Sequence, residues 1–166
     1  MMKKFLTGLC CLVFIMSVGC NQSKSQQYQP PTIPDFSFKT LNDKPFTRAD
    51  IKSGKKSMII LFDTSCEHCQ HEMKDIGNRF TDFKNVNFYL VSMDGKTEIV
   101  KFMESYGKKL YGQKNVTVLT DSLRQFIPTF QPTKFPAMYA YAANGSLIEY
   151  FSGQHDVNDI IKAINR

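Results

Sequence analysis

Two cysteines three positions apart follow a short apolar run. Residues 58–62 have the length and composition of a buried strand, and Cys66 and Cys69 come shortly after it. If a helix begins at Cys66, the two sulfurs lie one helical turn apart, close enough to form a disulfide with little backbone movement. The unpaired N–H groups of a helix N-terminus favour a thiolate, so we expect Cys66 to be the more nucleophilic thiol. The pattern predicts a strand-to-helix junction suited to thiol–disulfide exchange.

The N-terminal segment has the features of an export signal. Lys3 and Lys4 precede an almost uncharged apolar stretch, residues 5–18, which is short for a transmembrane helix. The stretch ends in Ser17-Val18-Gly19-Cys20, which resembles a bacterial lipobox. We therefore predict a lipoprotein-type signal peptide over residues 1–19, cleaved before Cys20, whose lipidation anchors the chain at the extracytoplasmic (periplasmic) face of a membrane. Ordinary cleavage that leaves a free Cys20 thiol, and retention as an uncleaved anchor, are the alternatives.

Cysteine count and charge narrow the class of protein. The 166 residues contain five cysteines and carry a formal net charge of +6. Without residues 1–19, 19 basic and 15 acidic residues remain, a net charge of +4. With Cys20 lipidated, Cys66 and Cys69 are the only free thiols left, which is typical of an exported redox protein rather than a disulfide-stapled domain. The basic residues are scattered along the chain, so no nucleic-acid partner is expected, and at most a weak preference for anionic membranes or acidic partners.

The remaining sequence divides into a tether and one domain. Residues 20–34 are polar and proline-rich and are predicted to be a flexible tether, and residues 35–166 form a single domain. Periodicity and turn residues predict an α/β fold. Predicted strands cover 36–41, 44–47, 58–62, 86–93, 116–119, 137–142 and 147–151, and predicted helices cover 66–83, 97–106, 121–126 and 156–164. Asn144-Gly145 predicts a hairpin between the last two strands.

The first predicted helix places its two cysteines differently. Cys69 lies four residues before Met73, on the same apolar stripe of the helix. We therefore expect Cys69 to be buried and Cys66 to lie at an exposed lip.

Three motifs in order resemble one known family. They are Pro34-Asp35-Phe36 followed by an Asn-Asp turn, the run Cys66-Glu67-His68-Cys69-Gln70-His71-Glu72-Met73, and Pro136 nine residues before Gly145. Together they resemble the TlpA/ResA-like branch of membrane-tethered thioredoxin-fold proteins. The resemblance implies a thioredoxin-like fold, with a central mixed sheet flanked by helices, an N-terminal strand or hairpin extension and a central insertion. It also implies a thiol–disulfide oxidoreductase without a cofactor.

The resemblance also implies roles for individual residues. Cys66 would be the nucleophile and Cys69 the resolving thiol, while Glu72 resembles an active-site acid of the family and would tune the pair. Phe135 and Pro136 would form a cis-proline loop that pairs with a substrate strand, although Pro136 as an ordinary trans loop proline is the alternative.

The residues between and before the cysteines bear on the redox properties. A protonated His68 would favour the Cys66 thiolate and Glu67 would oppose it, so both are candidate redox-tuning residues, with simple surface exposure as the alternative. Ser65 and Lys74 depart from the family, which usually has an aromatic residue and a proline there.

The predicted partners are protein thiol or disulfide substrates and a membrane redox protein. The resemblance favours the reductive direction, as in cytochrome c maturation or disulfide repair. A disulfide-forming oxidase or isomerase, and a non-catalytic tethered module that binds metal or a partner protein, are the alternatives.

Other redox and metal chemistries fit the sequence less well. No metal site is expected, because four converging ligands are not apparent. Gln70 excludes the C-x-x-C-H motif of covalent haem. Asp63 stands where a peroxiredoxin has threonine.

Overall fold

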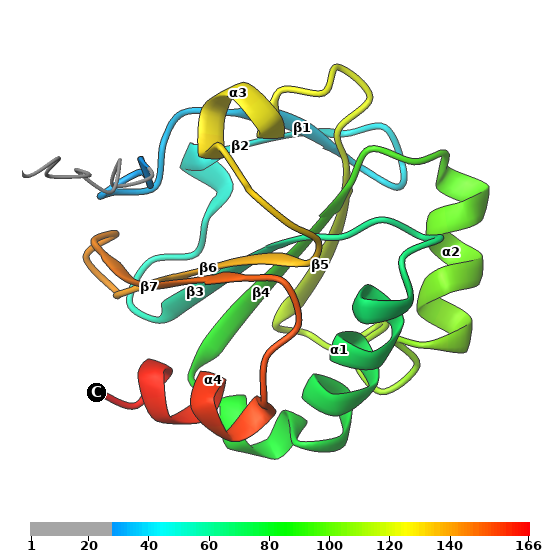
Figure 1. The fold of residues 1–166 in the computed structure, drawn as a ribbon. Helices are drawn as coiled ribbons and strands as arrows, with labels where there is room; N and C mark the ends of the chain where they lie inside the picture. The colour runs from blue at the N-terminus through cyan, green and yellow to red at the C-terminus, as the bar shows by residue number, and fades with distance from the viewer. Residues whose placement is uncertain (1–27) are drawn as a thin grey trace, which may run out of the picture.

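The computed structural model describes residues 28–166, which form one seven-stranded sheet with helices on both faces (Figure 1). The predicted signal peptide, Cys20 and the first part of the predicted tether lie outside the described residues. The strands are β1 Ser37–Thr40, β2 Pro45–Thr47, β3 Lys56–Leu61, β4 Val86–Ser92, β5 Val116–Thr120, β6 Ala137–Tyr141 and β7 Leu147–Ser152. The helices are α1 Glu67–Asn78, α2 Lys96–Ser105, α3 Phe126–Phe130 and α4 Val157–Ile164, with 3-10 turns at Arg48–Asp50 and Phe80–Phe83.

The sheet is mixed, as predicted, with a parallel centre. Its strand order is β2-β1-β5-β4-β3-β6-β7. β3, β4 and β5 run parallel, and the outer pairs on both sides are antiparallel. The central β4 is buried along its whole length, which is why its sequence is a continuous rather than an alternating apolar run. The additional helix and strand before α3, which correspond to the predicted insertion, are α2 and β5.

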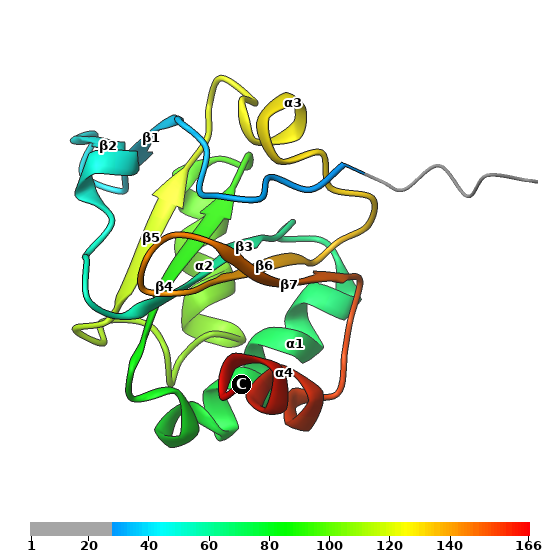
Figure 2. The same cartoon turned by 90° about the vertical axis from the view of Figure 1, so that its left-hand side faces the viewer.

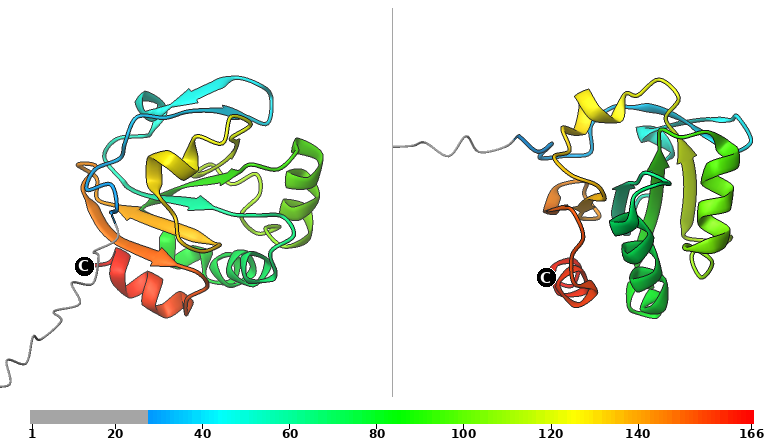
Figure 3. Two further views of the ribbon diagram at one scale, coloured as in Figure 1. Left: turned by 45° about the horizontal axis from the view of Figure 1, so that its top comes forward. Right: turned by 45° about the vertical axis from the view of Figure 1, so that its right-hand side comes forward.

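Alternate residues of the central strands supply two separate cores. Met58 and Ile60 of β3 point to the face covered by α1, α2 and α4, whereas Ile59 and Leu61 point to the face covered by α3 and the N-terminal segment. Figures 2 and 3 show these layers from the side, with α1 and α4 on one face and α3 on the other. None of the helices in residues 28–166 is long and apolar enough to cross a bilayer.

The packed part of the chain begins earlier than the predicted domain boundary at Asp35. The Ile33 N–H donates to the Gly145 carbonyl oxygen at 3.1 Å, and Thr32 forms a β-bridge with Ser146. Ile33 is only 5% exposed. The segment adds an edge contact to the β6–β7 hairpin, a long-range pairing that the polar, proline-rich sequence does not reveal.

The short helix after β5 is displaced from its predicted position. The sequence predicts a helix over 121–126, but α3 begins at Phe126. Arg124 has a φ of 53°, in the left-handed region, which interrupts helical geometry between Asp121 and α3. Asp121 still acts as a cap, because its carboxylate accepts the Gln125 N–H at 3.0 Å and the Phe126 N–H at 2.7 Å. Likewise the first helix ends at Asn78, and the rest of its predicted length is a separate 3-10 turn.

The buried cap at Asp121 gives a test of the fold. We expect Asp121→Ala to lower the free energy of unfolding by about 2 kcal/mol, because it removes two hydrogen bonds and leaves their donors unpaired. Asp35→Ala is the control, since it removes a carboxylate that is 92% exposed and paired only with Arg48, and it should change little. Urea unfolding measures both, and equal effects of the two variants would contradict the capping role.

Candidate active site

The loop that joins β3 to α1 is held from two sides. The Phe62 N–H donates to the Val91 carbonyl oxygen at 2.9 Å and continues the parallel pairing past the end of β3. The Thr64 N–H donates to Asp94 Oδ2 at 2.7 Å, and the Ser65 N–H donates to Asp63 Oδ1 at 2.8 Å. Side-chain acceptors thus satisfy backbone donors that no strand or helix can pair. The loop delivers the next residue, Cys66, to the N-cap position of α1 in a fixed orientation.

The two cysteines occupy different environments on one helical turn. Cys66 is the N-cap of α1 and half-buried, whereas Cys69 is fully buried. Both are free thiols, and the Cys69 N–H donates to Cys66 Sγ at 3.4 Å. The Cys66 sulfur therefore takes the place of the oxygen that usually caps a helix, and it receives the partial positive charge of the helix start. This is the exposed-lip and buried arrangement expected from the helical stripe.

Burial also separates the two thiols chemically. Burial raises the pKa of the Cys69 thiol well above its ordinary value. Cys69 therefore stays protonated at neutral pH until something removes its proton. Of the two sulfurs, the half-buried Cys66 sulfur is the one that a protein from outside can reach.

Glu72 is a carboxyl group inside the core, one helical turn after Cys69. Its Oε2 accepts the His155 N–H at 2.8 Å, and its buried Oε1 has no partner among the described residues. Burial raises the pKa of Glu72 to about 7. A carboxyl group with this pKa exchanges its proton near neutral pH, which makes it suited to acid–base work.

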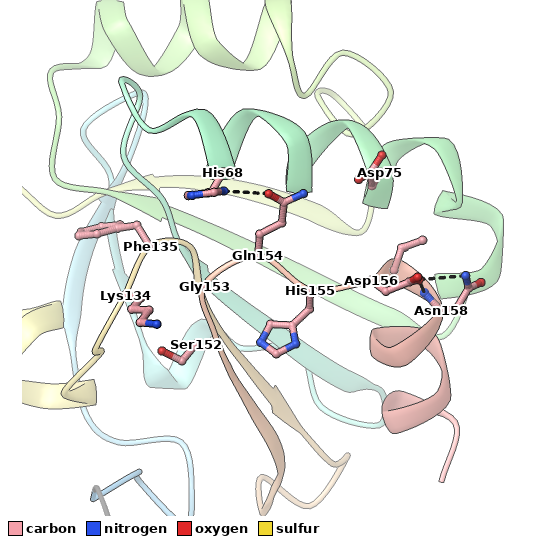
Figure 4. Close-up of a pocket in the computed structure, with 11 residues that line it drawn as sticks. His68, Asp75, Lys134, Phe135, Ser152, Gly153, Gln154, His155, Asp156 and Asn158 are labelled. Carbon is pink, nitrogen blue, oxygen red and sulfur yellow. Dashed lines mark hydrogen bonds between the residues drawn. The ribbon is translucent and has the colours of Figure 1, made fainter.

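A groove of about 750 Å³ runs beside the first turns of α1. One wall is α1, with His68 and Asp75, and the facing wall is formed by residues 152–158, from the end of β7 to the first turn of α4 (Figure 4). Phe135 and Lys134 close one end of it. Most of the lining side chains are polar, so the groove suits an extended polypeptide better than an apolar ligand.

Both residues between the cysteines are exposed, and within the described part of the chain only the side chain of His68 has a hydrogen-bond partner. His68 Nδ1 lies 2.9 Å from Gln154 Oε1, so a hydrogen bond crosses the groove from α1 to the facing loop (Figure 4). Glu67 lies in the first turn of α1 and is exposed.

The loop before β6 closes one end of the groove. The Phe135–Pro136 peptide bond is cis, the geometry expected from the sequence. Pro136 is buried, and its carbonyl oxygen accepts the Gly153 N–H at 2.9 Å. Phe135 is half-buried and lines the groove. Among residues 28–166, neither backbone polar group of Phe135 has a hydrogen-bond partner.

Three contributors to the site were not predicted from the sequence. Gln154 and His155 follow β7 in a polar turn with no motif, and they reach His68 and Glu72 only because the sheet brings β7 beside α1. Asp94 supports the cysteine loop from the end of β4. In the described part of the chain, no three histidine, cysteine or carboxylate side chains converge in a way that would hold a metal ion.

The fold and the cysteine pair together define the class. A mixed sheet whose central parallel strand leads into a helix capped by C-x-x-C is that of the thioredoxin-like thiol–disulfide oxidoreductases. The chain belongs to the AhpC/TSA family, whose model matches residues 31–144. No curated protein matches the chain.

Solved structures show the same fold at low sequence identity. DsbF of Mycobacterium tuberculosis (MTB), described in mixed oxidized and reduced forms, has a TM-score of 0.68 at 22% identity, and the match covers 83% of this chain and 98% of that one. A secreted Mycobacterium tuberculosis disulfide oxidoreductase homologous to E. coli DsbE has a TM-score of 0.63 at 18% identity over 78% and 94% of the two chains. A thiol:disulfide interchange protein of the thioredoxin family from Chlorobium tepidum TLS has a TM-score of 0.62 at 20% identity over 83% and 96%.

The buried Glu72 predicts a pH dependence of stability. Folding raises its pKa from the ordinary 4.5 to about 7, so the folded protein holds the proton more tightly than the unfolded chain does. The wild type should therefore lose stability as the pH rises from about 4.5 to about 7, and no further above that. Glu72→Gln removes the ionisable group, and we expect it to be more stable than the wild type by up to about 3 kcal/mol at pH 8. Urea unfolding across this pH range measures the difference, and parallel pH profiles for the two proteins would contradict it.

Proposed function

We propose that the protein is a membrane-tethered, extracytoplasmic enzyme that exchanges disulfides with protein substrates, and that it acts mainly as a reductant. The observation that carries this proposal is the pair of thiols on one turn: Cys66 half-buried at the helix start and Cys69 buried beside it. One thiol is placed to meet a substrate and the other to act only after the first has reacted.

In the first step, the Cys66 thiolate attacks one sulfur of a substrate disulfide. A bond forms between Cys66 Sγ and that sulfur, and the other substrate sulfur leaves as a thiolate and takes up a proton from water. The charge of the Cys66 thiolate is held by the Cys69 N–H and by the start of α1. The product is a mixed disulfide between enzyme and substrate.

In the second step, Cys69 resolves the mixed disulfide. Its thiol must lose a proton, and Glu72, three residues farther along α1, is a buried carboxyl group whose Oε1 has no partner among residues 28–166. We assign Glu72 as the group that accepts this proton. The Cys69 thiolate then attacks Cys66 Sγ and breaks its bond to the substrate. The Cys66–Cys69 disulfide forms, and the second substrate sulfur leaves as a thiolate that takes up a proton. Two electrons have passed from the pair to the substrate.

Phe135 is the proposed docking point for the substrate backbone. Its unpaired N–H and carbonyl groups can bond an extended strand, as the open edge of a sheet does. The adjacent groove has room for the side chains of that strand. Glu67 and His68 remain candidates for tuning the pair, with His68 held by Gln154.

The membrane tether, the direction of electron transfer and the redox partner concern more than the folded domain. The lipobox-like sequence before Cys20 supports a lipid anchor, and one of the structural neighbours is named as a secreted disulfide oxidoreductase. The resemblance to membrane-tethered reductants supports the reductive direction. A membrane redox protein would then return two electrons to the Cys66–Cys69 disulfide after each turnover.

Trapping of mixed disulfides tests the mechanism. We expect Cys69→Ser to accumulate covalent complexes with substrate proteins, because the resolving thiol is gone while the attacking thiol remains. The complexes should appear on non-reducing gels and disappear with dithiothreitol. Cys66→Ser is the matched control and should trap none, because Cys69 is buried. If Cys66→Ser retained full function, the protein would instead be a binding module.

The equilibrium reduction potential tests the direction. We expect the Cys66–Cys69 pair to have a potential near that of thioredoxin, about −270 mV, as measured by thiol alkylation in dithiothreitol buffers. A potential near about −120 mV would instead indicate an enzyme that forms disulfides.

A further inference from the structure

Charge is sorted along the strand axis of the domain. Because β3, β4 and β5 are parallel, the segments that lead into them meet at one end of the sheet, and the segments that leave them meet at the other. The leading segments and the first residue of β3 contain seven lysines, here called the basic end: Lys52, Lys55, Lys56, Lys84, Lys108, Lys109 and Lys114. At the opposite end, beside the cysteines, each strand is followed within two residues by an aspartate: Asp63, Asp94 and Asp121.

The positive charge of the basic end is not neutralised within the domain. None of its seven lysines forms an ion pair within residues 28–166, and all but the half-buried Lys56 are exposed. Of the nearby acids, Glu104 in the last turn of α2 is exposed and forms no ion pair within residues 28–166, whereas Asp82 and Asp50 are engaged. Asp82 pairs with Arg79 at 2.6 Å, and Asp50 accepts the Thr47 N–H at 2.8 Å. The basic end therefore presents a surface of excess positive charge to its surroundings.

The N-terminal segment joins the domain at this same end. The β6–β7 turn lies there, because Tyr141 of β6 pairs with Ser57 at the start of β3. Ile33 hydrogen-bonds to that turn, and a cavity of about 250 Å³ is lined by Ile33 together with Lys52 and Lys55. In Figure 1 the first described residues, the β6–β7 turn and the C-terminus lie on one side of the molecule, and α1 begins on the other.

We propose that the basic end docks on anionic lipid headgroups of the membrane to which Cys20 anchors the chain. The inference rests on the tethering proposed above. Cys20 precedes Tyr28 by eight residues, a reach of at most about 30 Å, so the domain is held close to the bilayer. Docking fixes its orientation. β3 has six residues, so the cysteines stand roughly 20 Å farther from the bilayer than the lysines and face protein substrates in solution.

The test measures orientation on vesicles with the lipid-anchored chain. The protein has no tryptophan, so a single one can be introduced without background. Asn85→Trp places it at the basic end, and Leu123→Trp places it after β5, where Leu123 is 72% exposed. Energy transfer to a dansyl-labelled lipid headgroup reports proximity to the bilayer. On vesicles of phosphatidylcholine with phosphatidylglycerol we expect clearly greater transfer from Asn85→Trp, and equal transfer from the two variants on pure phosphatidylcholine or at high salt.

Charge reversal provides the matched control. The control adds three substitutions to the Asn85→Trp protein: Lys84→Glu, Lys108→Glu and Lys109→Glu. We expect them to abolish the excess energy transfer over the Leu123→Trp protein, because each lysine removed weakens docking about fivefold. Charge reversal of Lys39, Lys101 and Lys134 makes the same change in net charge outside the basic end. This variant should keep the excess energy transfer. Equal transfer from both tryptophan positions on anionic vesicles would overturn the proposal, as expected if the basic end serves an acidic protein instead. Flotation with pure phosphatidylcholine vesicles tests the anchor separately. A chain that does not float lacks the proposed tether, whereas a chain that floats but shows equal transfer from both positions lacks the proposed orientation.

Discussion

The parallel pairing of β3, β4 and β5 is the constraint on which the rest of the structure depends. It forces every segment that leaves these strands to the same end of the sheet, where the N-terminus of α1 and the supporting Asp94 meet. It also forces the lysine-rich leading segments to the opposite end. One topological rule thus separates the chemically active end from the basic end, although the residues of both are interleaved along the chain.

The chemistry of the site follows from a difference in burial over a single helical turn. Cys66 caps α1 and can be reached, whereas Cys69 packs in the core and holds its proton. The same burial that separates the thiols raises the pKa of Glu72 into the neutral range. One apolar helix face, packed on β3, therefore produces the half-buried thiol at the helix start, the protected second thiol and a buried acid.

Sequence patterns predicted the order and type of all the main strands and helices, and they failed where long-range contacts override local preference. The segment around Ile33 is polar and proline-rich, yet it pairs with the β6–β7 hairpin. The helix expected to start at Asp121 begins five residues later, because Arg124 adopts a left-handed conformation while the Asp121 carboxylate caps the helix from a distance. The pairing of the Ile33 segment has no sequence period or motif from which it could be read. The Asp121 cap could be read from the sequence, but the left-handed residue that separates it from the helix could not.

The sequence by itself determined the strand-to-helix position of the C-x-x-C pair and which of its cysteines is buried, because helical spacing and an apolar run are local properties. Only the tertiary structure decided what surrounds the pair. Gln154 reaches His68 and the His155 N–H reaches Glu72 across more than eighty residues of sequence, because α1 and the β7–α4 loop lie on neighbouring parts of one sheet. The polarity of the domain, with aspartates at one end and lysines at the other, likewise exists only once the strands are parallel.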